Sequence, residues 1–278
     1  MSEDRTLATG LAATAPPLGA LSPRRRLRSH RWFGGAAGFA SLLVLWELLA
    51  VTVFASKHIV PTPFSVIQGI WDDRALYWEN IPATLRRAGE GWLWGNTLAV
   101  GVAIIVVEFP FAERLALRVA VIAYSLPLIA IGPILIILLN GDAPAATLAA
   151  LSVSFTTLVQ TILGLRSADR TSLELIRVYG GGWWARVVKV RLKAALPAMF
   201  TGLSIAGPAA VLGAIIGEYL GSTVGLGVFM INSEQAVNVP RTWGISIVAS
   251  ALAGLAYALT SLVGRMLTPW LRHGGSSR

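Results

Sequence analysis

Cysteine is absent from this chain, and histidine occurs at only 3 of its 278 positions. The lack of cysteine excludes disulfides, thiolate chemistry and cysteine-ligated metals. The histidines, His30, His58 and His273, are scattered and offer no metal-ligand spacing. No stretch of the form GxxxxGKS or GxxxxGKT occurs, so the phosphate-binding loop of an ATPase is also missing. We therefore predict no metal site, no bound cofactor and no catalytic residue in this chain.

Charged residues are scarce as well. They make up 13% of the chain, against about 25% in soluble domains, while 55% of the residues are hydrophobic. A membrane-spanning helix needs about 20 mostly apolar residues, and six stretches come close to that length. The sequence therefore predicts an all-α integral membrane protein with about six transmembrane helices. The predicted spans are residues 34–55, 91–107, 115–139, 143–165, 198–220 and 244–267.

The positive charges are unevenly distributed along the chain. The net charge is +9, and placing the N-terminus in the cytoplasm puts 18 of the 23 lysines and arginines in cytoplasmic segments. This is the positive-inside pattern, so both termini are predicted to be cytoplasmic, and the basicity reflects topology instead of binding to nucleic acid. We divide the chain into a disordered basic tail at 1–31, a transmembrane domain at 32–270 and a cytoplasmic tail at 271–278.

One polar, basic segment at residues 171–197 separates the fourth and fifth predicted spans. Thr171 and Glu174 form a capping-box pattern, which predicts the start of a short helix. Three glycines at 180–182 end that helix, because glycine tolerates the left-handed conformation that closes a helix. Helical periodicity resumes at Trp183 and runs to Pro197. We expect two short helices joined by a glycine corner, and we call this segment the elbow.

Polar and helix-breaking residues within the spans mark a candidate solute path. Pro127 and Pro133 each remove a backbone hydrogen bond and predict kinks in the third span. A polar stripe at i, i+4 spacing in the fourth span either lines the path or bonds a neighbouring helix. An acid near the outer end of the fifth span either shapes the outer mouth with Asn140 and Asp142 or is solvated. The stripe is Ser152, Thr156 and Gln160, and the acid is Glu218.

Small residues follow two stripes of the fifth span, one of which includes Gly213 and Gly217. Such stripes allow another helix to approach closely. The sequence leaves open whether that helix belongs to the same subunit or to a second copy. We expect the third, fourth and fifth spans to surround the path and to meet a second copy, because pairing would bury their polar and small-residue faces.

The elbow also carries a spaced residue pattern. Glu174 and Gly180 stand as in EAAxxxG, with Leu175 and Ile176 in place of the two alanines, and hydrophobic Leu192 follows. This pattern resembles the signature loop of the permease subunits of binding-protein-dependent ABC importers. The stretches LWELLA, VPTPFSVIQGIWD, TLRRAGEGW and GEYLGSTVGLGVFM resemble the nitrate, sulfonate and taurine branch of that family.

The resemblance implies partners and a role for the elbow, which in that family docks in a cleft of a cytoplasmic ATPase subunit. It implies a homodimer of permease chains, an ATPase dimer that holds ATP and Mg, and an extracytoplasmic solute-binding protein. The complex would lie in the lipid of the plasma (inner) membrane of a prokaryote and import a sulfonate, taurine or nitrate-like anion. The implied ATPase-coupling residues are Glu174, Leu175, Ile176, Tyr179, Gly180 and Gly181.

Two other functions compete with this one. A secondary transporter or channel for a small solute should show buried ionisable residues beyond Glu47, or matching broken helices in two halves of the chain. An integral membrane enzyme should show clustered His, Asp, Glu or Ser residues at a membrane face. Neither pattern is evident, so we prefer the permease function.

Overall fold

The computed structural model describes residues 30–54 and 59–268, apart from the side chains of residues 30–34 and 36. Most of the two predicted tails, 1–31 and 271–278, therefore lies outside the described residues. The chain divides into two compact units, residues 1–46 and 47–278, and each is considered by itself. In the first unit the described residues form the larger part of helix α1 (His30–Val51).

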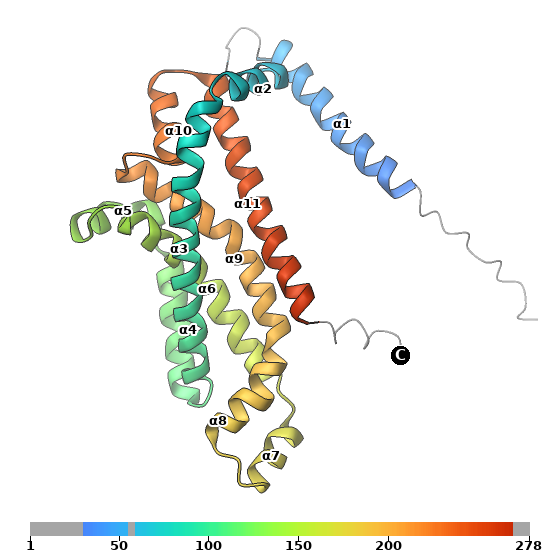
Figure 1. Ribbon diagram of the computed structural model, residues 1–278, viewed down its shortest axis with the longest axis vertical. Helices are drawn as coiled ribbons and strands as arrows, with labels where there is room; N and C mark the ends of the chain where they lie inside the picture. Colours follow the sequence, from blue (N-terminus) through green and yellow to red (C-terminus); the bar gives the residue numbers. More distant parts are fainter. Residues whose placement is uncertain (1–29, 55–58, 269–278) are drawn as a thin grey trace, which may run out of the picture. The chain divides into compact units, whose positions relative to one another are not determined.

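The second unit is built from helices too, and the described residues contain no strand. The predicted all-α fold is confirmed. Figure 1 shows α7 and α8 at one end of α3, α6 and α9, with α2 and α10 at the opposite end. The elements of this unit are α2 (Pro63–Asp72), α3 (Arg74–Val106), α4 (Pro110–Ser125), α5 (Leu128–Leu138), α6 (Ala143–Arg166), α7 (Arg170–Val178), α8 (Trp183–Arg186), the π-helix η1 (Val187–Arg191), α9 (Leu192–Gly221), α10 (Leu226–Gln235) and α11 (Val239–Leu267).

Four stretches of the described chain are long and apolar enough to cross a membrane: α3, α6, the run from Trp183 to Gly221, and α11. The pair α4 and α5 counts as a fifth if taken as one broken span, because the two helices meet at a bend of 95°. The bend lies at Pro127, where a kink was predicted, whereas Pro133 lies inside α5. The predicted count of six is not confirmed by the described residues, which in α1 include the apolar stretch Ala37–Val51.

Helix α3 begins at Arg74, well before the predicted start of the second span at residue 91. Its first half is polar, and three of its polar side chains are buried against other helices. Asn80, Thr84 and Arg87 are only 8%, 0% and 3% exposed. The helix is thus longer than the span predicted at 91–107, and a hydropathy window misses its first half because the window treats such residues as solvated.

The second helix of the elbow does not end at Pro197. A continuous helix runs from Trp183 to Gly221, and Pro197 and Pro208 both lie inside α9. Proline is tolerated inside membrane helices because neighbouring helices and local π or 3₁₀ adjustments satisfy the freed backbone groups. The predicted boundary at 197 is therefore wrong, and the elbow leads without interruption into the fifth predicted span.

Helix α6 packs against both α3 and α9, and glycines allow the close approach. A Cβ built on Gly213 of α9 would lie 2.8 Å from Ala149 Cα, and one on Gly217 would lie 2.8 Å from Ala145 Cβ. Real Cβ atoms do not tolerate such distances, so only glycine fits here. These two glycines pack inside the chain, and the expectation that their stripe meets a second copy is wrong.

Candidate functional site

The first helix of the elbow is capped by Asp169, not by Thr171. The Asp169 carboxylate accepts hydrogen bonds from the Ser172 amide at 2.8 Å and from the Ser172 hydroxyl at 2.9 Å. Those bonds, the amide's first, lower the pKa of the Asp169 carboxyl from its ordinary value, so the cap stays ionised near neutral pH. The predicted capping box is wrong, because Thr171 already lies inside α7. Glu174 is thereby left exposed on the helix surface.

The glycine corner closes α7 with a Schellman motif. The Gly181 amide donates to the Ile176 carbonyl at 2.8 Å, and the Gly180 amide donates to the Arg177 carbonyl at 3.0 Å. Gly180 has a φ of +75°, which favours glycine. A Cβ on Gly181 would lie 2.8 Å from the Ile176 carbonyl oxygen. Two of the predicted coupling residues therefore set the shape of the corner.

Several large apolar side chains are exposed on the elbow beside its charged ones. None of the nine described residues of α7 is buried. Leu175, Tyr179 and Trp184 are 56%, 82% and 68% exposed, and Val178 and Val188 are exposed as well. Ile176 is half-buried against the corner. Large apolar side chains gathered on a basic segment form a surface that a protein partner can cover.

Two ion pairs link residues on either side of the exposed part of the elbow to the α3–α4 turn and to the start of α4. Arg166, in the last turn of α6, contacts Glu113 at 2.7 Å. Arg191, the last residue of η1, contacts Glu108 at 2.9 Å. The sequence reasoning missed both pairs. The available signal was that Glu108 and Glu113 are acids in a turn that otherwise counted toward the positive-inside pattern.

A buried ion-pair network joins α3, α6 and α9 at the opposite end of the unit. Arg87 contacts the Glu218 carboxylate at 2.9 Å, and its Nε donates to Asp142 at 2.8 Å. Arg86 pairs with Asp142 from the exposed side. The Arg87 and Glu218 side chains are only 4% and 0% exposed. The expectation that Glu218 is solvated is wrong, because its carboxylate is enclosed. Its part in an outer mouth stays a prediction.

The same network holds the start of α10. The Gly227 amide donates to Glu218 at 3.0 Å, and the Leu226 amide donates to the Thr84 hydroxyl at 2.8 Å. Gly225, with a φ of +133°, passes so close that a Cβ there would lie 2.6 Å from a Glu218 carboxylate oxygen. The stretches TLRRAGEGW and GEYLGSTVGLGVFM, which carried part of the family resemblance, therefore bind one another.

The predicted polar stripe of α6 lies toward α9. The Ser152 hydroxyl donates to the Leu148 carbonyl of its own helix at 2.8 Å. A Cβ on Gly202 would lie 2.9 Å from Gln160 Cβ, which places Gln160 in the contact between α6 and α9. Thr156 is half-buried. The role of this stripe in a solute path stays a prediction.

A cavity of about 290 Å³ lies at the break between α4 and α5. Ser152 lines it, together with Leu126 and Leu128 on either side of Pro127. The Tyr124 and Phe155 rings stack at its wall with their centroids 4.6 Å apart. The structure thus brings two of the predicted path features, the break and one stripe residue, to one cavity, whereas Glu218 does not line it.

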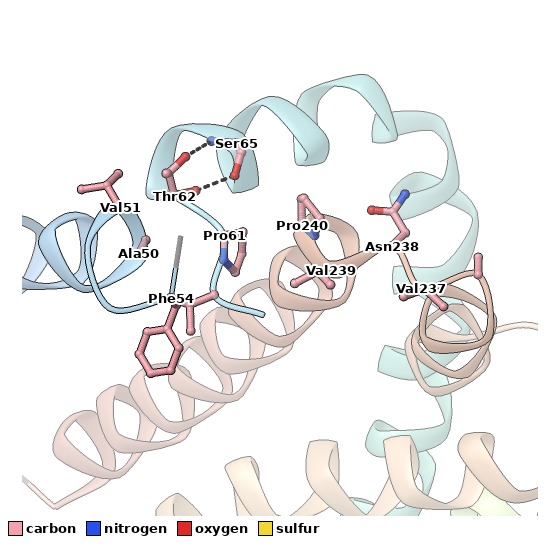
Figure 2. Close-up of a pocket in the computed structure, with 12 residues that line it drawn as sticks. Ala50, Val51, Phe54, Pro61, Thr62, Ser65, Val237, Asn238, Val239 and Pro240 are labelled. Carbon is pink, nitrogen blue, oxygen red and sulfur yellow. Dashed lines mark hydrogen bonds between the residues drawn. The ribbon is translucent and has the colours of Figure 1, made fainter. Parts of the chain in front are cut away.

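A larger pocket of about 780 Å³ is shown in Figure 2. Phe54, Pro61 and Thr62 line it beside the turn that joins α10 to α11. Val237 in that turn is 79% exposed and has a φ of +54°, a strained value for a β-branched residue. Residues 55–58, next to Phe54 in the chain, lie outside the described residues, so we base no function on this pocket.

Comparisons with known proteins place the chain. The family model of the binding-protein-dependent transport system inner membrane component matches residues 95–273. The chain belongs to this family. A probable ABC transporter permease protein of Haemophilus influenzae is 28% identical over 78% of this chain and 89% of its own length.

Two further relatives carry the name of a solute. The formylaminopyrimidine transport permease protein ThiX of Halalkalibacterium halodurans is 26% identical over 87% of this chain and 98% of its own length. The putative aliphatic sulfonates transport permease protein SsuC of Bacillus subtilis is 24% identical over 93% of this chain and 96% of its own length. The predicted resemblance to this family is confirmed.

The protein is therefore a membrane permease subunit of an ABC transporter for small solutes and not itself an enzyme. Family membership decides against the alternatives of a secondary transporter, a channel or a membrane enzyme. It names neither the solute nor the residues that meet each partner.

Proposed function

We propose that this permease serves an ATP-driven importer in which a cytoplasmic ATPase dimer docks on the elbow. The observation that carries the proposal is the exposed apolar surface of the elbow, above all Leu175, Tyr179 and Trp184. A helix turn fixed by Gly180 and Gly181 presents that surface in one defined shape. ATP and Mg belong, in this proposal, to the ATPase subunits, and the permease binds no cofactor.

The continuity of the elbow with α9 explains how docking can act on the membrane. Because the helix runs without a break from Trp183 to Gly221, we propose that a displacement of α8 is transmitted along it to the fifth predicted span. ATPase closure can favour one state of the permease only through contacts that differ between states. The contacts of Glu174 and Tyr179 with the ATPase are the proposed source of that difference.

The solute is proposed to be small and polar, with a sulfonate, taurine or nitrate-like anion as the first candidate. The name of the SsuC relative supports a sulfonate, and the name of the ThiX relative marks a competing class of solute. An extracytoplasmic binding protein would deliver the solute, as the family description implies. The cavity at the α4–α5 break, with Ser152, is the proposed part of the path.

A second copy of the chain is proposed to complete the path as a homodimer. The outer faces of α4 and α5 are apolar, with Ile122, Ile129 and Ile137 exposed by 65%, 59% and 85%. The cavity at the break opens among these helices. A partner permease there would enclose the cavity, which lipid would otherwise fill.

Orientation follows from charge, and we propose that both termini and the elbow are cytoplasmic in the plasma (inner) membrane of a prokaryote. Seven lysines and arginines lie between residues 166 and 193. Because the chain has no cysteine, single cysteines test this directly. An impermeant thiol reagent added to intact cells should label Trp78→Cys but not Gly182→Cys. Labelling of residue 182 would overturn the orientation.

The function is tested by reconstituting the purified permease with its ATPase in proteoliposomes and measuring ATP-dependent uptake with the cognate binding protein. Tyr179→Ser should lose both ATPase co-purification and uptake. Trp78→Ser is the matched control, because it also removes an exposed aromatic side chain but lies on α3 at the other end of the unit. It should keep the ATPase. Uptake without any ATPase subunit, or an unchanged Tyr179→Ser variant, would contradict the proposal.

A further inference from the structure

The turn between α3 and α4 touches the elbow at both of its ends. Glu108 follows α3 and contacts Arg191, where η1 passes into α9. Glu113 lies in the first turn of α4 and contacts Arg166, four residues before α7 begins. Glu108 in the turn and Glu113 at the start of α4 thus meet the two arginines that flank the exposed part of the elbow.

Both acids in these contacts are largely buried. The Glu113 side chain is only 3% exposed although its partner Arg166 is 57% exposed. Glu108 and Arg191 are both largely buried, with side chains 15% and 17% exposed. A buried carboxylate that loses its cation is strongly destabilised, so the turn is expected to follow the arginines when they move.

The π-helix η1 carries Arg191 as its last residue. The Leu192 amide donates to the Val187 carbonyl, one residue farther back than in an α-helix. Since each residue of an α-helix turns about 100°, an inserted residue rotates all later side chains by about that angle. Single π turns occur frequently at functional sites. Here the π turn contains both Val188, which is exposed on the elbow, and Arg191, which contacts Glu108.

Helix α4 connects this turn with the proposed solute path. It begins at Pro110, beside the two acids, and ends at Ser125, where the 95° bend to α5 and the cavity lined by Ser152 follow. Contact with the Arg166 and Arg191 ends of the elbow therefore acts on one end of α4. The opposite end of α4 forms the wall of the cavity.

We propose that the Glu108–Arg191 and Glu113–Arg166 pairs form a coupling clamp, which carries movement of the elbow to α4 and so to the break at Pro127. This inference rests on the proposed function, because it needs an ATPase that moves the elbow. The four residues are positioning residues: they touch neither ATP nor solute and act through α4.

The first test measures solute imported per ATP hydrolysed in proteoliposomes that contain the whole complex. Arg191→Gln should lower this ratio about tenfold, within the usual range of coupling between sites. Glu108→Arg alone should also lower the ratio. Combining it with Arg191→Glu, which exchanges the two charges, should restore most of the ratio. Arg114→Gln is the matched control, because Arg114 lies on α4 next to Glu113 but donates only to the Pro110 carbonyl of its own helix.

The second test separates coupling from a purely structural role. Spin labels at Thr171→Cys on α7, outside the proposed docking surface, and at Leu115→Cys on α4 both lie on exposed positions. With the clamp intact, their distance should stay constant through the ATP cycle. With Arg166→Gln and Arg191→Gln combined, the distance should change on ATP binding, because α7 would move without α4.

An unchanged import ratio in Arg191→Gln, or failure of the charge exchange to restore a lost ratio, would overturn the clamp. So would an ATP-dependent label distance in the otherwise unaltered protein. Failure of the proposed function looks different: the unaltered permease would then neither retain the ATPase nor import solute with ATP. The yield and elution profile of each purified variant in size-exclusion chromatography show whether the chain has folded.

Discussion

The two ends of the helical unit hold their charges in opposite ways. Around Arg87 and Glu218, side chains from three helices and the main chain of α10 enclose the ion pair almost completely. At the elbow, Leu175 and Tyr179 face outward, and ion pairs secure only its two ends. The difference indicates a rigid frame at one end and a surface for a partner at the other.

Stability should depend most on the enclosed end. Arg87→Leu leaves the Glu218 carboxylate buried without its cation, and we expect a loss of about 3–5 kcal/mol, seen as a large fall in thermal midpoint in detergent. Arg86→Leu removes the neighbouring, 58% exposed arginine of the same network and should cost about 0–1 kcal/mol. Similar losses in the two variants would remove the contrast between buried and exposed charges.

The glycine contact between α6 and α9 should come next. Gly217→Leu forces a side chain against Ala145 and should cost about 1–3 kcal/mol through overpacking. Gly101→Leu on α3 is the control, because no atom lies within 4 Å of its added Cβ. The loss should appear as less folded monomer, measured by thermal unfolding of single chains. If the single chain kept its stability and only the dimer were lost, Gly217 would instead belong to an interface between two copies.

The smallest effect on stability is expected at the elbow, and it should be accompanied by loss of function. Gly180→Ala strains a left-handed residue by about 1 kcal/mol and disturbs the corner. Gly182→Ala, at a φ of −73° and with open space around it, should behave like the unaltered protein. Uptake should fall only in Gly180→Ala, with thermal midpoints nearly equal. Equal uptake in both variants would show that the corner's shape is unimportant.

Features that depend on neighbouring residues were predictable from the sequence. The fourth span, predicted at 143–165, is α6 at Ala143–Arg166. A long apolar run in lipid forms a helix because only a helix satisfies all backbone hydrogen bonds within the segment. The end of α7 at the glycines was predictable for a similar reason, since only glycine readily adopts the φ of Gly180. The start of α7 was not, because Asp169 with Ser172 and Thr171 with Glu174 are overlapping cap patterns.

The partners of charged residues were not predictable, because they are distant in the sequence. Arg87 and Glu218 are 131 residues apart, and Glu113 and Arg166 are 53 apart. Local patterns hold no information on which helix ends meet. From the sequence, Arg86 and Arg87 are therefore only two charges outside the cytoplasmic segments. In the structure Arg87 is buried and pairs with both Asp142 and Glu218.

The central claim is that a partner ATPase covers the elbow and leaves the opposite end untouched. Single cysteines at Val178, on α7, and at Trp78, on α3, are 83% and 77% exposed positions that sample the two ends. Thiol modification should be measured for both in the reconstituted complex and in the permease alone. The account predicts that the ATPase protects the cysteine at 178 and cross-links to it, while modification at 78 is unchanged. Equal protection at both positions, or none at 178, would contradict it.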